Sequence, residues 1–172
     1  MGLFLNRTNR SGIIKAGVIG GLDQSGTYKL DCRFMKADLV QKVRRIAAVR
    51  SQVKLTKLDA VKFISDIIPT TSTRTLVNLD PPYFGKGPDL YTNFYRPEDH
   101  SALAKAIRTI KRRWMVTYDD AVEIRKIYAS YPTYTSALNY SAQEKKVGSE
   151  LLVLDPAVIV PGDLAQFKVV KI

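Results

Sequence analysis

Short apolar runs alternate with amphipathic segments along most of the chain, and this alternation limits the possible folds more than any other feature. Strands are expected at residues 53–55, 76–79, 114–117, 134–140 and 150–154. Helices, in which apolar residues recur every three or four positions, are expected at residues 37–50, 59–67, 97–112 and 120–129. Strands that alternate with helices predict an α/β fold with a largely parallel sheet and helices on both faces.

The amino-terminal part has a different character, because residues 10–26 contain five glycines and no sustained periodicity. We expect a long loop or an irregular hairpin there. Residues 1–62 also carry 13 Lys and Arg against 4 Asp and Glu, a net charge of +9 out of +11 for the whole chain. Such a field favours a polyanion as partner, since each neutralised phosphate releases a counterion. A solvated basic face without a ligand is the alternative.

Scarce residue types exclude some chemistry. Cys32 and His100 are the only residues of their kinds, so one chain cannot build a disulfide framework or a structural zinc site. His100 follows Pro97 in the acidic first turn of an expected helix, which predicts a surface histidine rather than a catalytic base. No apolar run reaches the roughly 18 residues of a membrane span, and no signal peptide is evident. We therefore expect a cytoplasmic protein that binds neither membrane nor metal.

An unusual motif, Asp80-Pro81-Pro82-Tyr83-Phe84, follows the expected strand at 76–79. One explanation is a rigid turn, because proline fixes φ and keeps the residue before it extended. A second explanation also gives the acid and the ring a role. Asp80 and a backbone carbonyl, that of Pro81, accept the two N–H groups of an exocyclic amine and so localise its lone pair for attack. Tyr83 offers a π-face to a base rotated out of a duplex.

With this motif and several others, the chain resembles the D12-class (Dam-like) DNA adenine-N6 methyltransferases almost from end to end. The residues that carry the resemblance are Leu5 to Gly12, Gly17 to Gly21, Asp31 to Phe34, Leu58 to Ala60, Asp80 to Tyr83, Lys86-Gly87, Leu90 to Asn93, Asp99-His100, Thr117 to Asp119, Tyr140 to Ala142 and Gly148 to Glu150. The resemblance implies S-adenosylmethionine as methyl donor and adenine in double-stranded DNA as acceptor. It also implies an incomplete Rossmann-like methyltransferase fold with an inserted target-recognition segment.

The same resemblance implies roles for individual residues. Asp80, Pro81, Pro82 and Tyr83 match the family's catalytic motif, and Asp59, Ala60 and Asp80 fall where the family contacts the cofactor. A helix N-cap explains Asp59 equally well. The contacts expected with DNA are Asn6, Arg7, Arg10, Lys15 and Arg33, although Arg7 and Arg33 also fit internal ion pairs. Residues 1–36 then form the end of the target-recognition region, and residues 37–172 form the catalytic portion.

The chain departs from the family's pattern at its start. The family's glycine-rich cofactor loop and the acidic residue after it belong upstream of the recognition region, and neither is found before Leu5. Gly17 to Gly21 is no substitute, because it follows no convincing strand and leads into no helix. We therefore expect that the main cofactor-binding part is absent, that the sheet has unpaired edges, and that activity is missing or depends on a second chain. A smaller departure is Met35, where Asn is expected and where a polar cap is lost.

Two other functions fit the same residues. One is a DNA-binding remnant without catalysis, which rests on the basic amino-terminal segment. The other keeps the enzyme but changes the acceptor to cytosine N4 or to an RNA base, because an acid-Pro-Pro-aromatic motif suits amino-group methylation in general.

Overall fold

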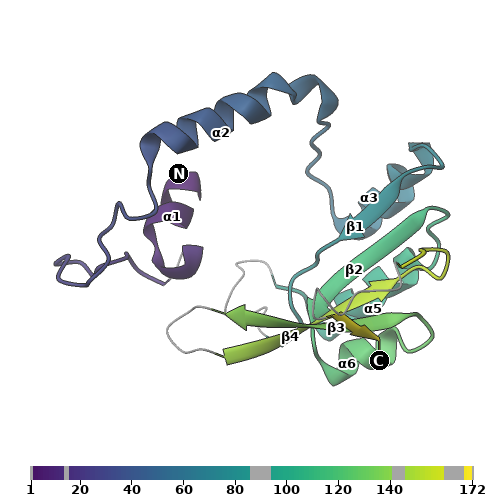
Figure 1. The fold of residues 1–172 in the computed structure, drawn as a ribbon. Helices are drawn as coiled ribbons and strands as arrows, with labels where there is room; N and C mark the ends of the chain where they lie inside the picture. The colour runs from purple at the N-terminus through teal and green to yellow at the C-terminus, as the bar shows by residue number, and fades with distance from the viewer. Residues whose placement is uncertain (1, 14–15, 86–93, 141–145, 161–168, 172) are drawn as a thin grey trace. The chain divides into compact units, whose positions relative to one another are not determined.

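The computed structural model describes residues 2–13, 16–85, 94–140, 146–160 and 169–171. The chain divides into two compact units, Met1–Lys57 and Leu58–Ile172 (Figure 1). The boundary expected at residues 36 and 37 therefore falls inside the first unit.

The first unit consists of short helices joined by a loop. Its elements are α1 (Gly2–Thr8), η1 (Arg10–Gly12), α2 (Lys36–Ala48) and η2 (Arg50–Gln52). Met35 is the N-cap of α2 and its side chain makes no capping hydrogen bond, as its apolar side chain predicted. The strand expected at residues 53–55 is not formed. Leu55 is 92% exposed there, so a run of three apolar-rich residues without a neighbouring strand does not pair.

The loop between η1 and α2 is ordered around one glutamine. Gln24 Nε2 donates to the carbonyls of Ile19 (2.8 Å) and Gly21 (2.6 Å), and its Oε1 accepts from Leu30 N (2.8 Å). Gly20 has a φ of +87°, and a Cβ there would lie 2.8 Å from the carbonyl oxygen of Tyr28. The glycine-rich segment is thus an irregular loop, as expected, and its turns need glycine at this close approach.

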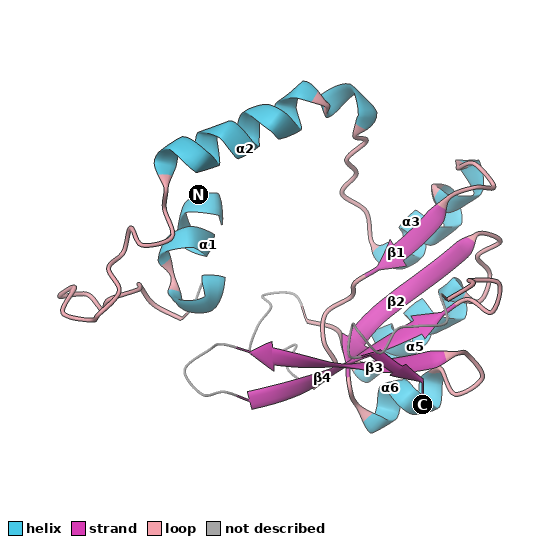
Figure 2. Ribbon diagram, in the orientation of Figure 1, coloured by secondary structure: helices cyan, strands magenta, loops and turns pink. Residues whose placement is uncertain are grey.

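The second unit alternates helices and strands around one mixed sheet (Figure 2). Its elements are α3 (Ala60–Asp66), η3 (Ile68–Thr70), β1 (Leu76–Leu79), α5 (Pro97–Ile107), β2 (Arg113–Asp119), α6 (Val122–Ile127), β3 (Thr133–Tyr140), β4 (Lys146–Leu154) and β5 (Val169–Lys171). The predicted α/β class is confirmed at this level.

The sheet has the strand order β1-β2-β4-β3-β5. Only β1 and β2 pair in parallel, with Val77 opposite Trp114, and the other three pairings are antiparallel. The expectation of a largely parallel sheet is therefore wrong for the carboxyl-terminal half. The two last predicted strands form an antiparallel hairpin, and its second strand enters the sheet beside β2 instead of continuing the parallel order.

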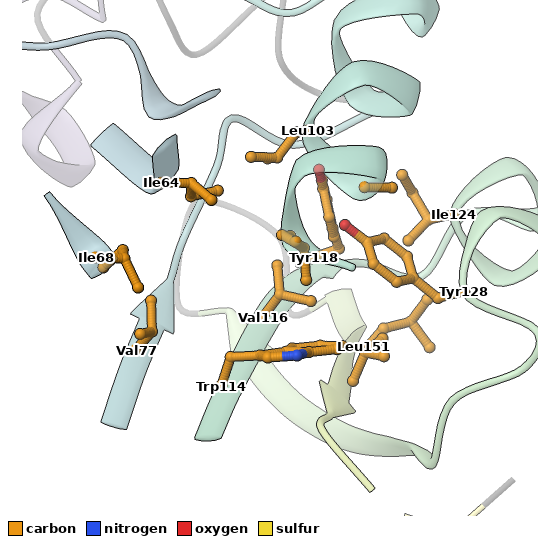
Figure 3. Close-up of a cluster of buried hydrophobic side chains, with 13 residues drawn as sticks. Ile64, Ile68, Val77, Leu103, Trp114, Val116, Tyr118, Ile124, Tyr128 and Leu151 are labelled. Carbon is orange, nitrogen blue, oxygen red and sulfur yellow. The ribbon is translucent and has the colours of Figure 1, made fainter. Parts of the chain in front are cut away.

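One face of this sheet carries the core. Every second residue of β2 is buried, namely Trp114, Val116 and Tyr118. Figure 3 shows Ile64 and Ile68 beside Val77, and Tyr118 beside Ile124 and Tyr128. The helices that contribute to this cluster are α3, α5 and α6. The residues between them in β1 and β2 face away from it, and Asn78 and Thr117 are exposed or half-buried. Among the described residues the helices of the core thus cover one face, not both as we predicted.

Two local features hold β1 in place. The amide of Arg96 donates to Asp99 Oδ2 (2.8 Å), which caps α5, and Pro97 occupies its first turn as expected. The guanidinium of Arg112 donates to the carbonyls of Ser72 (3.0 Å) and Thr71 (2.8 Å), just before β1. This arginine therefore satisfies backbone oxygens that no strand or helix bond satisfies.

Candidate active site

The acid of the motif lies at the carboxyl end of β1, on the face of the sheet that is turned away from the core. Side chains alternate along a strand, so buried Val77 and half-buried Leu79 face the core, while Asn78 and Asp80 face the opposite way. Thr117 of β2 faces this side too, and its hydroxyl donates to Asp80 Oδ1 (2.8 Å). Asp80 is exposed and held at one of its two oxygens.

The backbone after the motif is held by Asp119, the last residue of β2. Its Oδ1 accepts from Phe84 N and its Oδ2 from Gly85 N, both at 2.7 Å. A Cβ at Gly85 would lie 3.1 Å from Asp119 Oδ2, so glycine lets the loop approach the carboxylate closely. Two charge-assisted hydrogen bonds to adjacent amides fix the direction in which the loop leaves the sheet.

The aromatic residue of the motif is fixed from a third strand. The hydroxyl of Tyr83 donates to Glu150 Oε1 on β4. Glu150 is the cross-strand partner of Asp119 in the antiparallel pair of β2 and β4. Two carboxylates side by side therefore hold consecutive residues of one loop, the first by two backbone amides and the second by a phenol.

His100 lies beneath this loop. Its ring centroid lies 5.1 Å from that of Phe84, 5.3 Å from that of Tyr95 and 5.5 Å from that of Tyr118. Its Nδ1 lies 3.1 Å from the hydroxyl oxygen of Tyr118. The prediction of a surface histidine is wrong, because His100 is 1% exposed. The acidic helix start was recognised correctly, but the side chain of its fourth residue turns inward to the sheet.

Burial also decides the charge of these groups. It lowers the pKa of His100, although the carboxylates of Asp119 and Asp99 act in the opposite direction. It raises the pKa of Tyr118 far above its usual range. The imidazole is therefore neutral near pH 7 and packs as an aromatic ring.

A cavity of about 320 Å³ opens on the other side of His100. Its walls come from Asp59, Val61, Phe94, Tyr95, Asp99 and Ala102. Burial and the two carboxylates raise the pKa of Tyr95, so its hydroxyl keeps its proton. Through the ring of His100, this cavity connects to the loop of the motif, since His100 contacts both Tyr95 and Phe84.

Asp59 has one of its two expected roles. Its Oδ1 accepts from Val61 N (2.9 Å) and Lys62 N (3.3 Å), so it is the N-cap of α3. It also lines the cavity, so the cap does not exclude a ligand contact through Oδ2. Ala60 is half-buried and packs against the core cluster.

No protein-family model matches this chain, and no curated protein matches it. Within the described ranges no helix is long and apolar enough to cross a membrane. The same residues contain no group of three or more His, Cys, Asp or Glu that could hold a metal ion.

The residues expected to contact DNA all belong to the first unit. Arg10 is exposed and borders a cavity of about 490 Å³ formed with the loop from Ile19 to Tyr28. Arg33 donates to the main-chain oxygen of Asn6, a link within the unit rather than an ion pair. Arg7 is half-buried, and its Nε is buried without a hydrogen bond in the described part of the chain. Lys15 lies outside the described residues, as do Lys86-Gly87, Leu90 to Asn93 and Ser141-Ala142.

The structure thus brings together residues that sequence analysis named only as parts of a resemblance. Thr117, Asp119 and Glu150 each contact the motif, and His100 packs against it, but none was predicted as a site residue. The signal was present, because Asp119 ends a strand in the same sheet as β1. The register that brings Glu150 beside Asp119 depends on an antiparallel insertion that the sequence pattern did not show.

Proposed function

We propose that this protein is a portion of a site-specific DNA methyltransferase that transfers a methyl group from S-adenosylmethionine to the N6 amine of an adenine rotated out of the duplex. The observation that carries the proposal is the fixed geometry of the motif. Separate strands hold Asp80, Tyr83 and the amides of Phe84 and Gly85. Preorganised acceptors of this kind are what an amine needs in order to become a nucleophile.

Asp80 is the acceptor for the target amine. Thr117 occupies Oδ1, which leaves Oδ2 to accept one N–H of the substrate. The carbonyl of Pro81 accepts the second N–H, and the proline rings keep it in place. With both N–H groups held, the nitrogen lone pair is directed at an electrophile, and Asp80 need not take a proton before attack.

The residues around the cavity at Asp59 suit the adenosine part of the cofactor. Phe94 and Tyr95 offer aromatic surface to a purine, and Asp59 and Asp99 offer carboxylate oxygens to its amine. S-adenosylmethionine, when bound, supplies an electrophilic methyl group on a sulfonium. Of this chain's residues, Asp59 and Ala60 are the ones we assign to hold it, together with Asp80.

The edge of the sheet supports the proposal of a second chain as partner. Among the described residues β1 pairs with β2 alone. Its sequence, Leu-Val-Asn-Leu, has none of the lysines or prolines that guard exposed edges, and Leu76 is 55% exposed. A strand from a partner would cover this edge and bring further cofactor contacts beside Asp80.

The basic charge favours a second candidate function, DNA binding without catalysis. Residues 1–57 carry 12 basic and 3 acidic side chains, a net +9. The acceptor also stays open between adenine and another exocyclic amine, cytosine N4 or an RNA base, because the Asp80 geometry suits any of them.

A methyl-transfer assay with labelled S-adenosylmethionine and DNA tests the proposal. Asp80→Ala should abolish transfer and leave DNA affinity close to that of the unaltered protein. Asp66→Ala, which removes an exposed carboxylate of α3, is the matched control and should change neither. A large loss of DNA affinity in Asp80→Ala, or transfer that survives it, would contradict the assigned role. Failure of the unaltered protein to bind the labelled cofactor would contradict the cofactor assignment.

A further inference from the structure

We propose that Glu150 is the positioning residue for Tyr83 and that its carboxylate fixes the phenol ring as the surface on which the target base stacks. This inference rests on the proposed function, because it assigns a use to the ring in that reaction.

The first argument is the contact itself. The hydroxyl of Tyr83 donates to Glu150, a residue 67 positions further along the chain on another strand. Tyr83 is half-buried, so part of its ring surface remains open to a ligand. A phenol that is bound at its hydroxyl and follows two prolines has little freedom to turn. Stacking then costs less side-chain entropy than it would with a free ring.

The second argument is that a carboxylate at position 150 has a cost. Like charges directly opposite each other on adjacent strands destabilise a sheet, and Asp119 and Glu150 are such a pair. Asp119 offsets its share through the amides of Phe84 and Gly85. The bond to Tyr83 is the corresponding gain for Glu150. Both charges of the pair are thus directed at one loop, which indicates that the pose of this loop matters.

The third argument concerns what Tyr83 is left able to do. Its hydroxyl proton is directed to Glu150, so the phenol is not a proton donor for the substrate. The face of the ring is its remaining means of recognition. Asp80 therefore holds the amine while Tyr83 holds the plane of the base, and Glu150 sets the angle between the two.

Fluorescence of 2-aminopurine tests the inference without knowledge of the recognition sequence. The probe is a DNA duplex with one bulged 2-aminopurine, which lies outside the stack without help from the protein and loses fluorescence when it stacks on tyrosine. The full chain should quench it. Glu150→Ala should weaken this binding by about fivefold to tenfold, and Tyr83→Phe by a similar factor. Glu150→Gln, which keeps an acceptor oxygen, should recover most of the loss.

The double variant separates positioning from a general structural role. Once Tyr83 is replaced by Phe, Glu150→Ala should cause no further loss of quenching, because the bond is already gone. Glu123→Ala removes an exposed carboxylate of α6 and should behave like the unaltered protein.

Two results would overturn the inference alone. They are quenching by the unaltered chain together with unchanged binding in Glu150→Ala, or losses that simply add in the double variant. If Glu150→Ala does not fold, Tyr83→Phe breaks the same bond from the other side, and binding equal to that of the unaltered chain refutes the role. Absence of quenching by the unaltered chain would instead refute the proposed function itself, and the inference with it.

Discussion

At the scale of single residues, the site depends on side chains that lie far from the motif in sequence. Asp80 and Tyr83 were predicted from the motif itself, and the structure places both at the end of β1. The residues that hold them could not be predicted, because a hydrogen bond between positions 83 and 150 leaves no local pattern. His100 is the clearest case, since its helical position was recognised but its burial was not.

The buried imidazole predicts how stability depends on pH. Burial lowers the pKa of His100 below its ordinary value of 6.5. The unfolded chain therefore takes up a proton near pH 6.5 that the folded chain resists, and folding stability falls as the pH drops from there towards the lower, folded pKa. The slope can reach about 1.4 kcal/mol per pH unit. Above pH 7 the contribution of this group is constant.

Denaturant unfolding at pH 7.5 and 5.5 measures this effect. His100→Phe should be less stable at pH 7.5, because it loses the contact with Tyr118, but its stability should change less between the two pH values. His100 is the only histidine, so no other imidazole contributes to the difference. An equal pH dependence in both proteins would contradict a neutral, buried His100.

At the scale of elements, most helices and strands lie where the sequence predicted them, and their ends follow local rules. Asp59 caps α3 and Pro97 begins α5, as the residue types indicated. Helix α5 ends at Ile107 instead of residue 112, because Arg112 is directed to the carbonyls before β1. The strand at 53–55 is missing, since strands need a partner and that segment has none among the described residues.

The N-cap of α3 offers a test that separates structure from cofactor binding. Asp59→Ala should lower the free energy of unfolding by about 1 kcal/mol, because two amides of the first turn lose their acceptor. Asp59→Asn keeps a capping oxygen and should cost only a few tenths of that. Both variants lack the carboxylate, so affinity for S-adenosylmethionine should fall in both alike. Affinity that follows stability instead would make Asp59 a cap alone.

At the scale of the whole molecule, charge and chemistry are divided between the two units. The net charge is +9 for residues 1–57 and +2 for residues 58–172, where the motif lies. This division was visible in the sequence, because charge counts need no structure. It agrees with a protein in which one unit contributes most of the attraction to a polyanion.

Salt dependence of DNA binding tests this division. The logarithm of affinity should fall linearly with the logarithm of salt concentration, and removing one phosphate contact should reduce the slope by about 1. Arg10→Ala and Arg44→Ala, two exposed residues of the first unit, should each do so. Lys111→Ala, an exposed lysine of the second unit, should leave the slope unchanged. Equal effects at all three positions would show that the charge acts without regard to its place.

The sequence by itself determined the α/β class, the positions of most elements, the location of the motif at a strand end and the concentration of positive charge. These follow from local periodicity, capping residues and composition, which act over a few residues at a time. Only the tertiary structure decided that β4 lies between β2 and β3, that the helices of the core share one face, and that His100 is buried. The same holds for the partners of the motif. Thr117, Asp119 and Glu150 reach it because strand pairing places distant residues side by side, and the choice of neighbour is made by the packing of the whole unit.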